Sequence, residues 1–176
     1  MKKDRLLLLS SILFGTVVSD QVTKVIAREH LQGKGTLTYL GDTVRLVYAE
    51  NYGAFLGMGA NMPDVMRRLI FVGFVAVFLI AFLVWILRTE EISKMTLWAS
   101  GLVVGGGIGN LIDRIFRDGG GVTDFMNLGI GGLRTGIFNV ADLWIVAGIV
   151  LLFFSPEFRA GLRGEEEEKE EKLPEK

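Results

Sequence analysis

The chain has 176 residues, half of them hydrophobic, and a formal net charge of −1. This composition is too apolar for an ordinary soluble domain of this length, so we expect one membrane-embedded domain over residues 1–163. The chain has no cysteine and one histidine, His30, which excludes disulfides, thiol nucleophiles and metal sites built from several Cys or His side chains. We therefore expect no metal and no cofactor.

Four apolar stretches are long enough to span a bilayer, which takes about 20 residues in a helix. They cover residues 5–25, 68–87, 95–112 and 137–154. The first begins like a signal peptide, but no small-x-small cleavage site precedes its polar end, so we expect it to be retained as a span. Residues 164–176 contain seven acids and three bases, and we expect them to form a disordered cytoplasmic tail.

The segments between the spans predict further structure. Residues 36–47 alternate apolar and polar side chains around Gly41-Asp42, which predicts a small hairpin. Residues 119–136 are rich in glycine and predict a mobile loop that turns tightly or approaches a ligand closely. The expected fold is an α-helical membrane protein in which four transmembrane helices carry a small extracytoplasmic β-platform and this Gly-rich loop.

The predicted topology brings polar residues of distant segments to one membrane face. Basic residues at the N-terminus and after the last span favour both termini in the cytoplasm. The end of the first span, the end of the third and the start of the fourth then meet the outer face, together with both long loops. The polar residues expected there are Asp20, Lys24, Asn110, Asp113, Arg114, Asn139 and Asp142. This convergence indicates a functional site near the outer face.

Two aspartates are the candidate reactive groups. Asp142 lies inside the fourth apolar stretch, where an ionisable side chain is costly and is a functional candidate by default. Asp124 lies in the predicted Gly-rich loop. Two carboxylates held close at a partly dry site share one proton. The ionised member can take a proton from water that attacks a peptide carbonyl, and the protonated member can polarise that carbonyl and later protonate the leaving nitrogen.

Each candidate also has a purely structural interpretation. Asp142 can be a hydrogen-bonding residue between helices, and Asp124 an ordinary turn residue. For Asp20 and Lys24 we favour an i,i+4 ion pair that supports the structure. In the third span, glycines recur every four residues and allow another helix to approach closely. These glycines are Gly101, Gly105 and Gly109.

Five short motifs, taken together, resemble the lipoprotein signal peptidase family (signal peptidase II), aspartic proteases of the bacterial inner membrane. In chain order the motifs are Asp20-Gln-Val-Thr-Lys24, Asn51-Tyr-Gly-Ala-Phe55, Gly109-Asn-Leu-Ile-Asp-Arg114, Val122-Thr-Asp-Phe125 and Phe138-Asn-Val-Ala-Asp142. One departure is visible: Phe55 directly follows Ala54, where many members have two small residues before the phenylalanine.

The resemblance implies an endopeptidase that removes signal peptides from prolipoproteins after a diacylglyceryl group is attached to the cysteine that becomes the new N-terminus. Asp124 and Asp142 would be the catalytic dyad. The residues implied to position substrate or carboxylates are Asn51, Gly53, Asn110, Arg114 and Asn139. Those implied to support the site are Asp20, Lys24, Asp113, Gly105 and Gly109. The expected partners are this substrate and membrane lipid, with no nucleic acid, and the expected state is a monomer.

Three other functions fit the sequence less well. An ion- or proton-coupled transporter also uses intramembrane Asp and Asn, but here the polar residues gather at one face and do not form a path across. Another class of intramembrane aspartic protease carries Gly-x-Gly-Asp, whereas Gly107-Ile-Gly109 is followed by Asn110. A membrane scaffold without catalysis leaves the paired aspartates unexplained.

Overall fold

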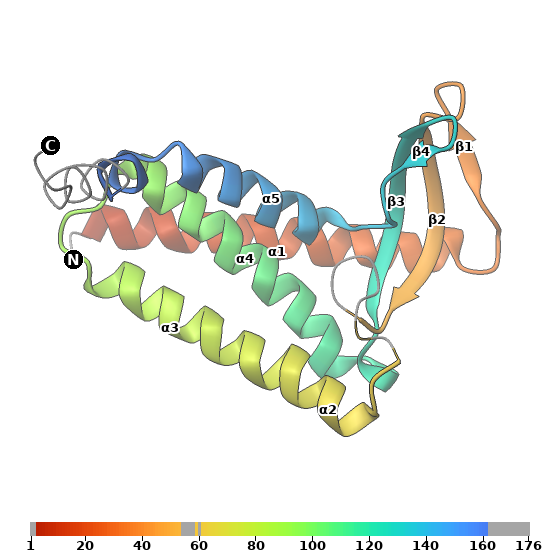
Figure 1. The fold of residues 1–176 in the computed structure, drawn as a ribbon, viewed down its shortest axis with the longest axis horizontal. Helices are drawn as coiled ribbons and strands as arrows, with labels where there is room; N and C mark the ends of the chain where they lie inside the picture. The colour runs from red at the N-terminus through yellow and green to blue at the C-terminus, as the bar shows by residue number, and fades with distance from the viewer. Residues whose placement is uncertain (1–2, 54–58, 60, 162–176) are drawn as a thin grey trace, which may run out of the picture.

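The structure is a computed structural model that describes residues 3–53, 59 and 61–161. A bundle of helices carries a small antiparallel sheet at one end (Figure 1). The tail predicted at 164–176 and the departure at Ala54–Phe55 lie outside the described residues.

The helices pack side by side in the bundle. In the chain, the first two strands follow the first helix, and the last two strands precede the last helix. In chain order the helices are α1 (Lys3–Leu31), α2 (Asp64–Arg68), the π-helical segment η2 (Leu69–Phe74), α3 (Val75–Arg88), α4 (Lys94–Phe116) and α5 (Val140–Phe153). A short 3₁₀ turn, η3 (Asp118–Gly120), precedes the third strand.

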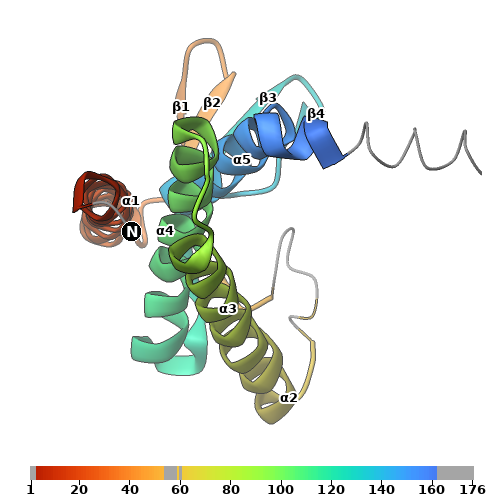
Figure 2. The ribbon, with the colours of Figure 1, turned by 90° about the vertical axis from the view of Figure 1, so that its left-hand side faces the viewer.

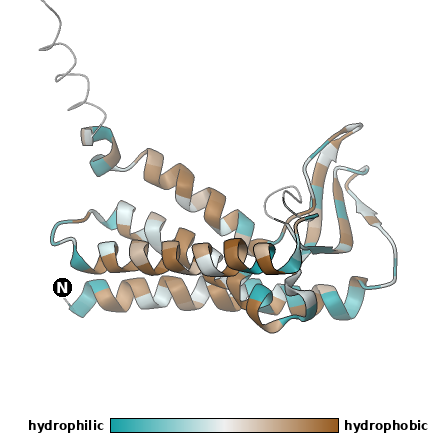
Figure 3. Cartoon of the chain, turned by 60° about the horizontal axis from the view of Figure 1, so that its bottom comes forward, coloured by the Kyte–Doolittle hydropathy of each residue, from teal (hydrophilic) through white to brown (hydrophobic). Residues whose placement is uncertain are grey.

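Among the described residues, three helices are long and apolar enough to cross a membrane: Lys3–Leu31, Asp64–Arg88 and Lys94–Phe116. The helix α5 is apolar but has only 14 residues, which reach about 21 Å at a rise of about 1.5 Å each. It is shorter than the predicted fourth span because Asn139 is extended and caps the helix at that point. Figure 3 shows hydrophobic residues along the helices and hydrophilic ones gathered near their ends. The predicted helical membrane fold is confirmed.

The helix α4 is the centre of the bundle, with α1, α3 and α5 packed around it (Figure 2). Its glycine stripe faces α1, as the four-residue spacing predicts. A Cβ built on Gly101 would lie 2.9 Å from the Ile12 side chain, and one built on Gly105 would lie 1.9 Å from Thr16 Oγ1. The two backbones therefore approach more closely than any larger residue would permit.

The sheet has four antiparallel strands in the order β1-β2-β3-β4. They are β1 (Leu37–Tyr39), β2 (Val44–Asn51), β3 (Val122–Ile130) and β4 (Leu133–Arg134). The predicted hairpin around Gly41-Asp42 is confirmed as β1 and β2. Both turn residues have positive φ, +62° and +69°, which glycine adopts freely and aspartate tolerates.

The prediction that Asp124 lies in a Gly-rich loop within residues 119–136 is wrong, because this residue lies in a strand. Half of this stretch, Val122–Ile130, is β3, which pairs with β2 from Val122 to Leu128, and Asp124 lies opposite Ala49. The glycines with positive φ lie at the turns that bound the strand: Gly119 and Gly120 have φ of +70°, and Gly131 has φ of +56°. The glycine content predicted the turns correctly. It did not predict the strand, because the partner strand β2 is more than 70 residues away in the sequence.

The contact between α1 and α4 gives a first prediction. Gly105→Ala forces the new methyl group against Thr16, and we expect overpacking of about 1 to 3 kcal/mol and a lower unfolding temperature in detergent. The matched control is Gly15→Ala in the middle of α1, where a Cβ meets nothing within 4 Å. Equal unfolding temperatures for the two variants would contradict the packing described here.

Candidate active site

Asp142 is placed by the start of α5. Asn139 is the N-cap, and the two residues form a capping box. The Asp142 backbone N–H donates to Asn139 Oδ1 at 3.1 Å, and the Asn139 backbone N–H donates to Asp142 Oδ2 at 3.1 Å. Asn followed by Asp three residues later can form such a reciprocal cap, so the Asp142 carboxylate is fixed by the helix that carries it.

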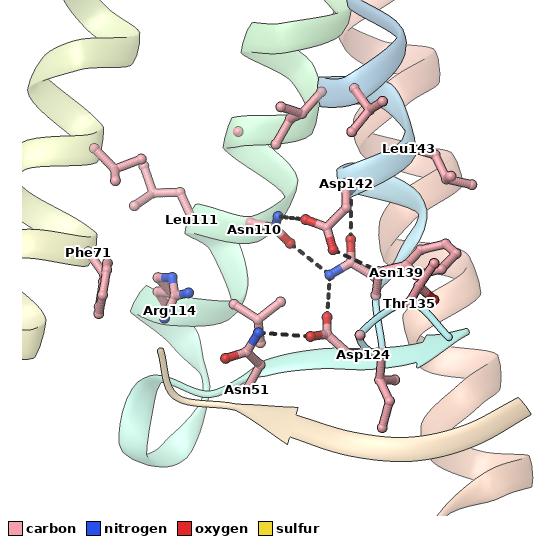
Figure 4. A pocket seen from close by; sticks show the side chains of 18 of the residues that line it. Asn51, Phe71, Asn110, Leu111, Arg114, Asp124, Thr135, Asn139, Asp142 and Leu143 are labelled. Atoms are coloured by element: carbon pink, nitrogen blue, oxygen red, sulfur yellow. Dashed lines mark hydrogen bonds between the residues drawn. The ribbon is translucent and has the colours of Figure 1, made fainter. Parts of the chain in front are cut away.

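The Asn139 side chain lies between the two aspartates (Figure 4). Its Nδ2 donates to Asp124 Oδ1 at 2.6 Å and to Asn110 Oδ1 at 3.1 Å. Asn110 Nδ2 in turn donates to Asp142 Oδ1 at 2.9 Å. On the far side, Asn51 Nδ2 donates to Asp124 Oδ2 at 3.0 Å. Each carboxylate thus accepts two N–H donors, and three amides orient the pair.

Burial and hydrogen bonding act in opposite directions on Asp124. The residue is 2% exposed, and this burial raises the pKa of the Asp124 carboxyl to about 6 because it disfavours the charged form. The hydrogen bonds from Asn51 and Asn139 lower this pKa, and the nearby negative charge of Asp142 raises it. The Asp124 carboxyl is therefore protonated at mildly acidic pH, where an ordinary aspartate is ionised.

Lys24 is fully buried beneath the aspartates. Its Nζ lies 2.8 Å from Asp20 Oδ2 and 3.3 Å from Asp113 Oδ2, and it donates to Asn110 Oδ1 at 2.9 Å. The predicted i,i+4 pair of Asp20 and Lys24 is present, but it belongs to a larger buried network. Because Lys24 takes the Asn110 oxygen, the amide nitrogen of Asn110 faces Asp142.

The two acids around Lys24 also bind the backbone next to each candidate aspartate. Asp20 Oδ1 accepts the N–H of Ala141 at 2.9 Å, and Asp113 Oδ2 accepts the N–H of Thr123 at 3.0 Å. These contacts fix the beginnings of α5 and β3. Gly109 permits the first of them, since a Cβ there would lie 2.5 Å from Asp20 Oδ2.

Arg114 and Gly53 act at the edge of the site. The Arg114 guanidinium donates to the carbonyls of Gly53 and, at 3.5 Å, Gly120, and it lies 4.9 Å from the centroid of the Phe71 ring. The Gly53 N–H donates to Asn51 Oδ1 at 3.0 Å, which turns the Asn51 nitrogen toward Asp124. Arg114 thus binds the backbone at Gly53, close to Asn51 in the chain, and at Gly120, and lies over the Phe71 ring.

The sequence interpretation missed Gln21. Its Nε2 donates to Asp20 Oδ2 at 3.1 Å, to the Gly109 carbonyl at 3.0 Å and to Asp113 Oδ1 at 3.4 Å. Its place inside the Asp20–Lys24 motif was a usable signal, because that motif contributes two other buried polar residues. Phe71 also escaped notice, since one aromatic residue within an apolar span carries no distinguishing pattern.

The aspartates form part of the wall of a cavity of about 560 Å³. Most other lining residues are apolar and come from η2, α3, α4, β3 and α5, among them Phe71, Val75, Leu111, Val122, Ile145 and Val146. Within the described part of the chain, no group of three or more His, Asp or Glu side chains could bind a metal ion. The arrangement places two hydrogen-bonded carboxyl groups beside a mainly apolar cavity.

The buried network gives a second prediction. Lys24→Met leaves Asp20 and Asp113 facing each other without a cation, and we expect a loss of about 3 to 5 kcal/mol in unfolding free energy, as for other broken buried pairs. Arg45→Met is the control, because its partner Asp42 lies in an exposed pair on the hairpin and such pairs contribute little. Denaturant unfolding in detergent compares them, and a Lys24→Met protein as stable as the control would contradict the role given to Lys24.

Comparisons with known proteins agree with this geometry. The family model for signal peptidase (SPase) II matches residues 12–157. A lipoprotein signal peptidase of Treponema denticola is 36% identical over 151 residues, which cover 82% of this chain and 85% of the relative. A lipoprotein signal peptidase of Borrelia hermsii is 34% identical over 159 residues, which cover 86% of this chain and 91% of that relative.

Two solved structures, each described as a bacterial membrane enzyme, have the same fold. One has a TM-score of 0.74 at 24% identity and covers 96% of this chain and 93% of its own. The other has a TM-score of 0.72 at 25% identity, and the match covers 83% of this chain and 90% of the solved one. The apolar helices and the sequence matches together make this a multi-pass protein of the bacterial inner membrane, and the chain belongs to the signal peptidase II family, the peptidases that remove signal peptides from prolipoproteins.

Proposed function

We propose that this chain is an aspartic endopeptidase that cleaves diacylglyceryl-modified prolipoproteins at the peptide bond before the lipidated cysteine. The observation that carries the proposal is the pair Asp124 and Asp142, joined through Asn139 at the wall of a mainly apolar cavity among the spanning helices. An apolar cavity suits a signal peptide, and two carboxylates suit hydrolysis by activated water.

The two aspartates have different surroundings, and we assign them different roles. Asp142 accepts N–H donors from Asn110 and from the Asn139 backbone at the N-terminus of α5, where the helix dipole favours a negative charge. Asp124 is the buried carboxyl with the raised pKa. We therefore assign the proton at pH below about 6 to Asp124 and the role of general base to Asp142.

The reaction then needs only these two groups and one water. Asp142 takes a proton from the water, and the water oxygen attacks the peptide carbonyl carbon. At the same time Asp124 donates its proton to the carbonyl oxygen, which gives a gem-diol intermediate. Asp142 next gives its proton to the leaving nitrogen while the C–N bond breaks, and Asp124 recovers one from the diol. The ionised member thus protonates the nitrogen, which differs from the order expected from the sequence.

The cavity accounts for recognition of an apolar substrate. Phe71 and Val75 line it from the η2–α3 side and Ile145 and Val146 from α5, so a signal peptide helix can bury apolar surface between them. Acyl chains of the substrate can remain in lipid beside the helices. In this proposal both termini are cytoplasmic, the aspartates lie near the outer face, and the enzyme acts as a monomer.

The dyad gives a third prediction. Asp124→Asn and Asp142→Asn should each lower cleavage by at least about 10³-fold, since removing a member of a catalytic unit costs on this order. A gel-shift assay on diacylglyceryl-modified and unmodified prolipoprotein measures this, and only the lipidated form should be cut. Asp118→Asn, in the 3₁₀ turn outside the cavity lining, is the control for loss of a charge. A variant of either dyad residue that keeps full activity would disprove the assignment.

The raised pKa of Asp124 gives a fourth prediction. Because the protonated form is the active one, kcat/KM should fall as pH rises through about 6, at about tenfold per pH unit well above that value. Asn51→Ala removes a hydrogen-bond donor that favours the ionised form of Asp124, so the pKa of Asp124 should rise further. The fall of kcat/KM in this variant should therefore begin at a higher pH than in wild type, although its maximal kcat/KM is lower. A wild-type profile that stays flat to pH 9 would contradict the proton on Asp124.

A further inference from the structure

The strand β2 carries two polar groups on opposite faces at its end. Asn51 and Ala49 share the face of Asp124, which lies opposite Ala49 in the register. Glu50 lies on the other face, away from the cavity, and its carboxylate collects three partners there. Glu50 is thus the immediate neighbour of Asn51 in the chain, although it does not line the cavity.

The partners of Glu50 form a compact group that we call the Glu50 cluster: Tyr48, Glu50, Tyr52 and Arg117. Glu50 Oε1 accepts from Tyr48 Oη at 2.6 Å and from Arg117 Nη2 at 2.8 Å. Glu50 Oε2 accepts from Tyr52 Oη, and Arg117 Nη2 also lies 3.1 Å from Tyr48 Oη. Arg117 is the C-cap of α4, so the cluster joins the end of β2 to the end of that helix.

Tyr52 extends the same connection to the turn before β3. A Cβ on Gly119 or Gly121 would lie 3.0 Å from Tyr52 Cε1, so the ring packs directly against this turn. On another side of the ring, the Arg67 guanidinium lies 5.4 Å from its centroid and donates to the Gly119 carbonyl at 3.2 Å. Asp124 follows Gly121 by three residues, so the cluster ties together both segments that meet at the Asn51–Asp124 hydrogen bond.

Asn51 needs such a support because of its place in the ladder. Its pair with Val122 is the last of the β2–β3 register, and the ends of strands open more readily than their centres. The residues on either side of Asn51, Glu50 and Tyr52, are both held by the cluster. We propose that the Glu50 cluster is a positioning device that keeps the Asn51 amide against Asp124 and thereby sets the turnover of the peptidase.

This inference rests on the proposed function and is tested by a double-mutant cycle. Glu50→Ala should lower kcat about tenfold with little change in KM, since small displacements of a positioning group are costly. In the Asn51→Ala background the same change should cost less than about twofold, because the residue acts through Asn51. Glu50→Gln keeps one acceptor oxygen and should recover part of kcat.

The control is Asp42→Asn on the hairpin, which weakens the ion pairs of Asp42 with Arg45 at 2.6 Å and with Arg134 at 3.7 Å and should leave kcat unchanged. Full activity of Glu50→Ala, an equal loss in both backgrounds, or a raised KM with unchanged kcat would overturn the proposal. The assay includes wild type and Asp124→Asn, so failure of the peptidase assignment is recognised separately.

A second readout does not depend on cleavage. The side-chain amide signal of Asn51 in ¹H–¹⁵N NMR, identified by its loss in Asn51→Ala, should shift or broaden in Glu50→Ala and stay in place in Asp42→Asn. An unchanged signal in Glu50→Ala would overturn the positioning role even if the protein cleaved no substrate.

Discussion

The buried ammonium of Lys24 must be neutralised where it lies, and the polar half of the structure is organised by that requirement. A lysine has three N–H donors, and here they meet Asp20, Asp113 and Asn110. Each acceptor has a second partner. These partners are the backbone before Asp142, the backbone before Asp124 and the Asp142 carboxylate itself. One cation thus determines where a helix begins, where a strand begins and how an amide is oriented.

Close helix packing makes this arrangement possible. Three glycines of α4 face α1: Gly101 lies against Ile12, Gly105 against Thr16 and Gly109 against Asp20. The stripe that brings the two helices together therefore ends at the charged network. Among apolar lipid tails, such contact depends on shape and on polar bonds between helices, since burial of apolar surface brings no gain there. The packing of the bundle and the geometry of the carboxylates therefore share the same residues.

The sequence predicted those features that depend on local pattern. Apolar runs predicted the spanning helices, and the cost of a carboxylate in such a run singled out Asp142. The strand β3 was missed because its glycine-rich flanks indicate turns, while its partner β2 lies far away in the chain. The length of the last helix was also missed, because the cap at Asn139 was not recognised. The pairing of Lys24 with Asp113, and of Glu50 with Arg117, depends on contacts over some 70 to 90 positions that no local pattern reveals.

The bridging amide has a consequence for the movement of protons. Asn139 Nδ2 uses its hydrogens on Asp124 and Asn110, and an amide nitrogen has no basic lone pair with which to accept a proton. The side chain therefore orients the two carboxylates but insulates them from each other. No proton can pass along it, so any exchange between the aspartates must go through whatever occupies the cavity.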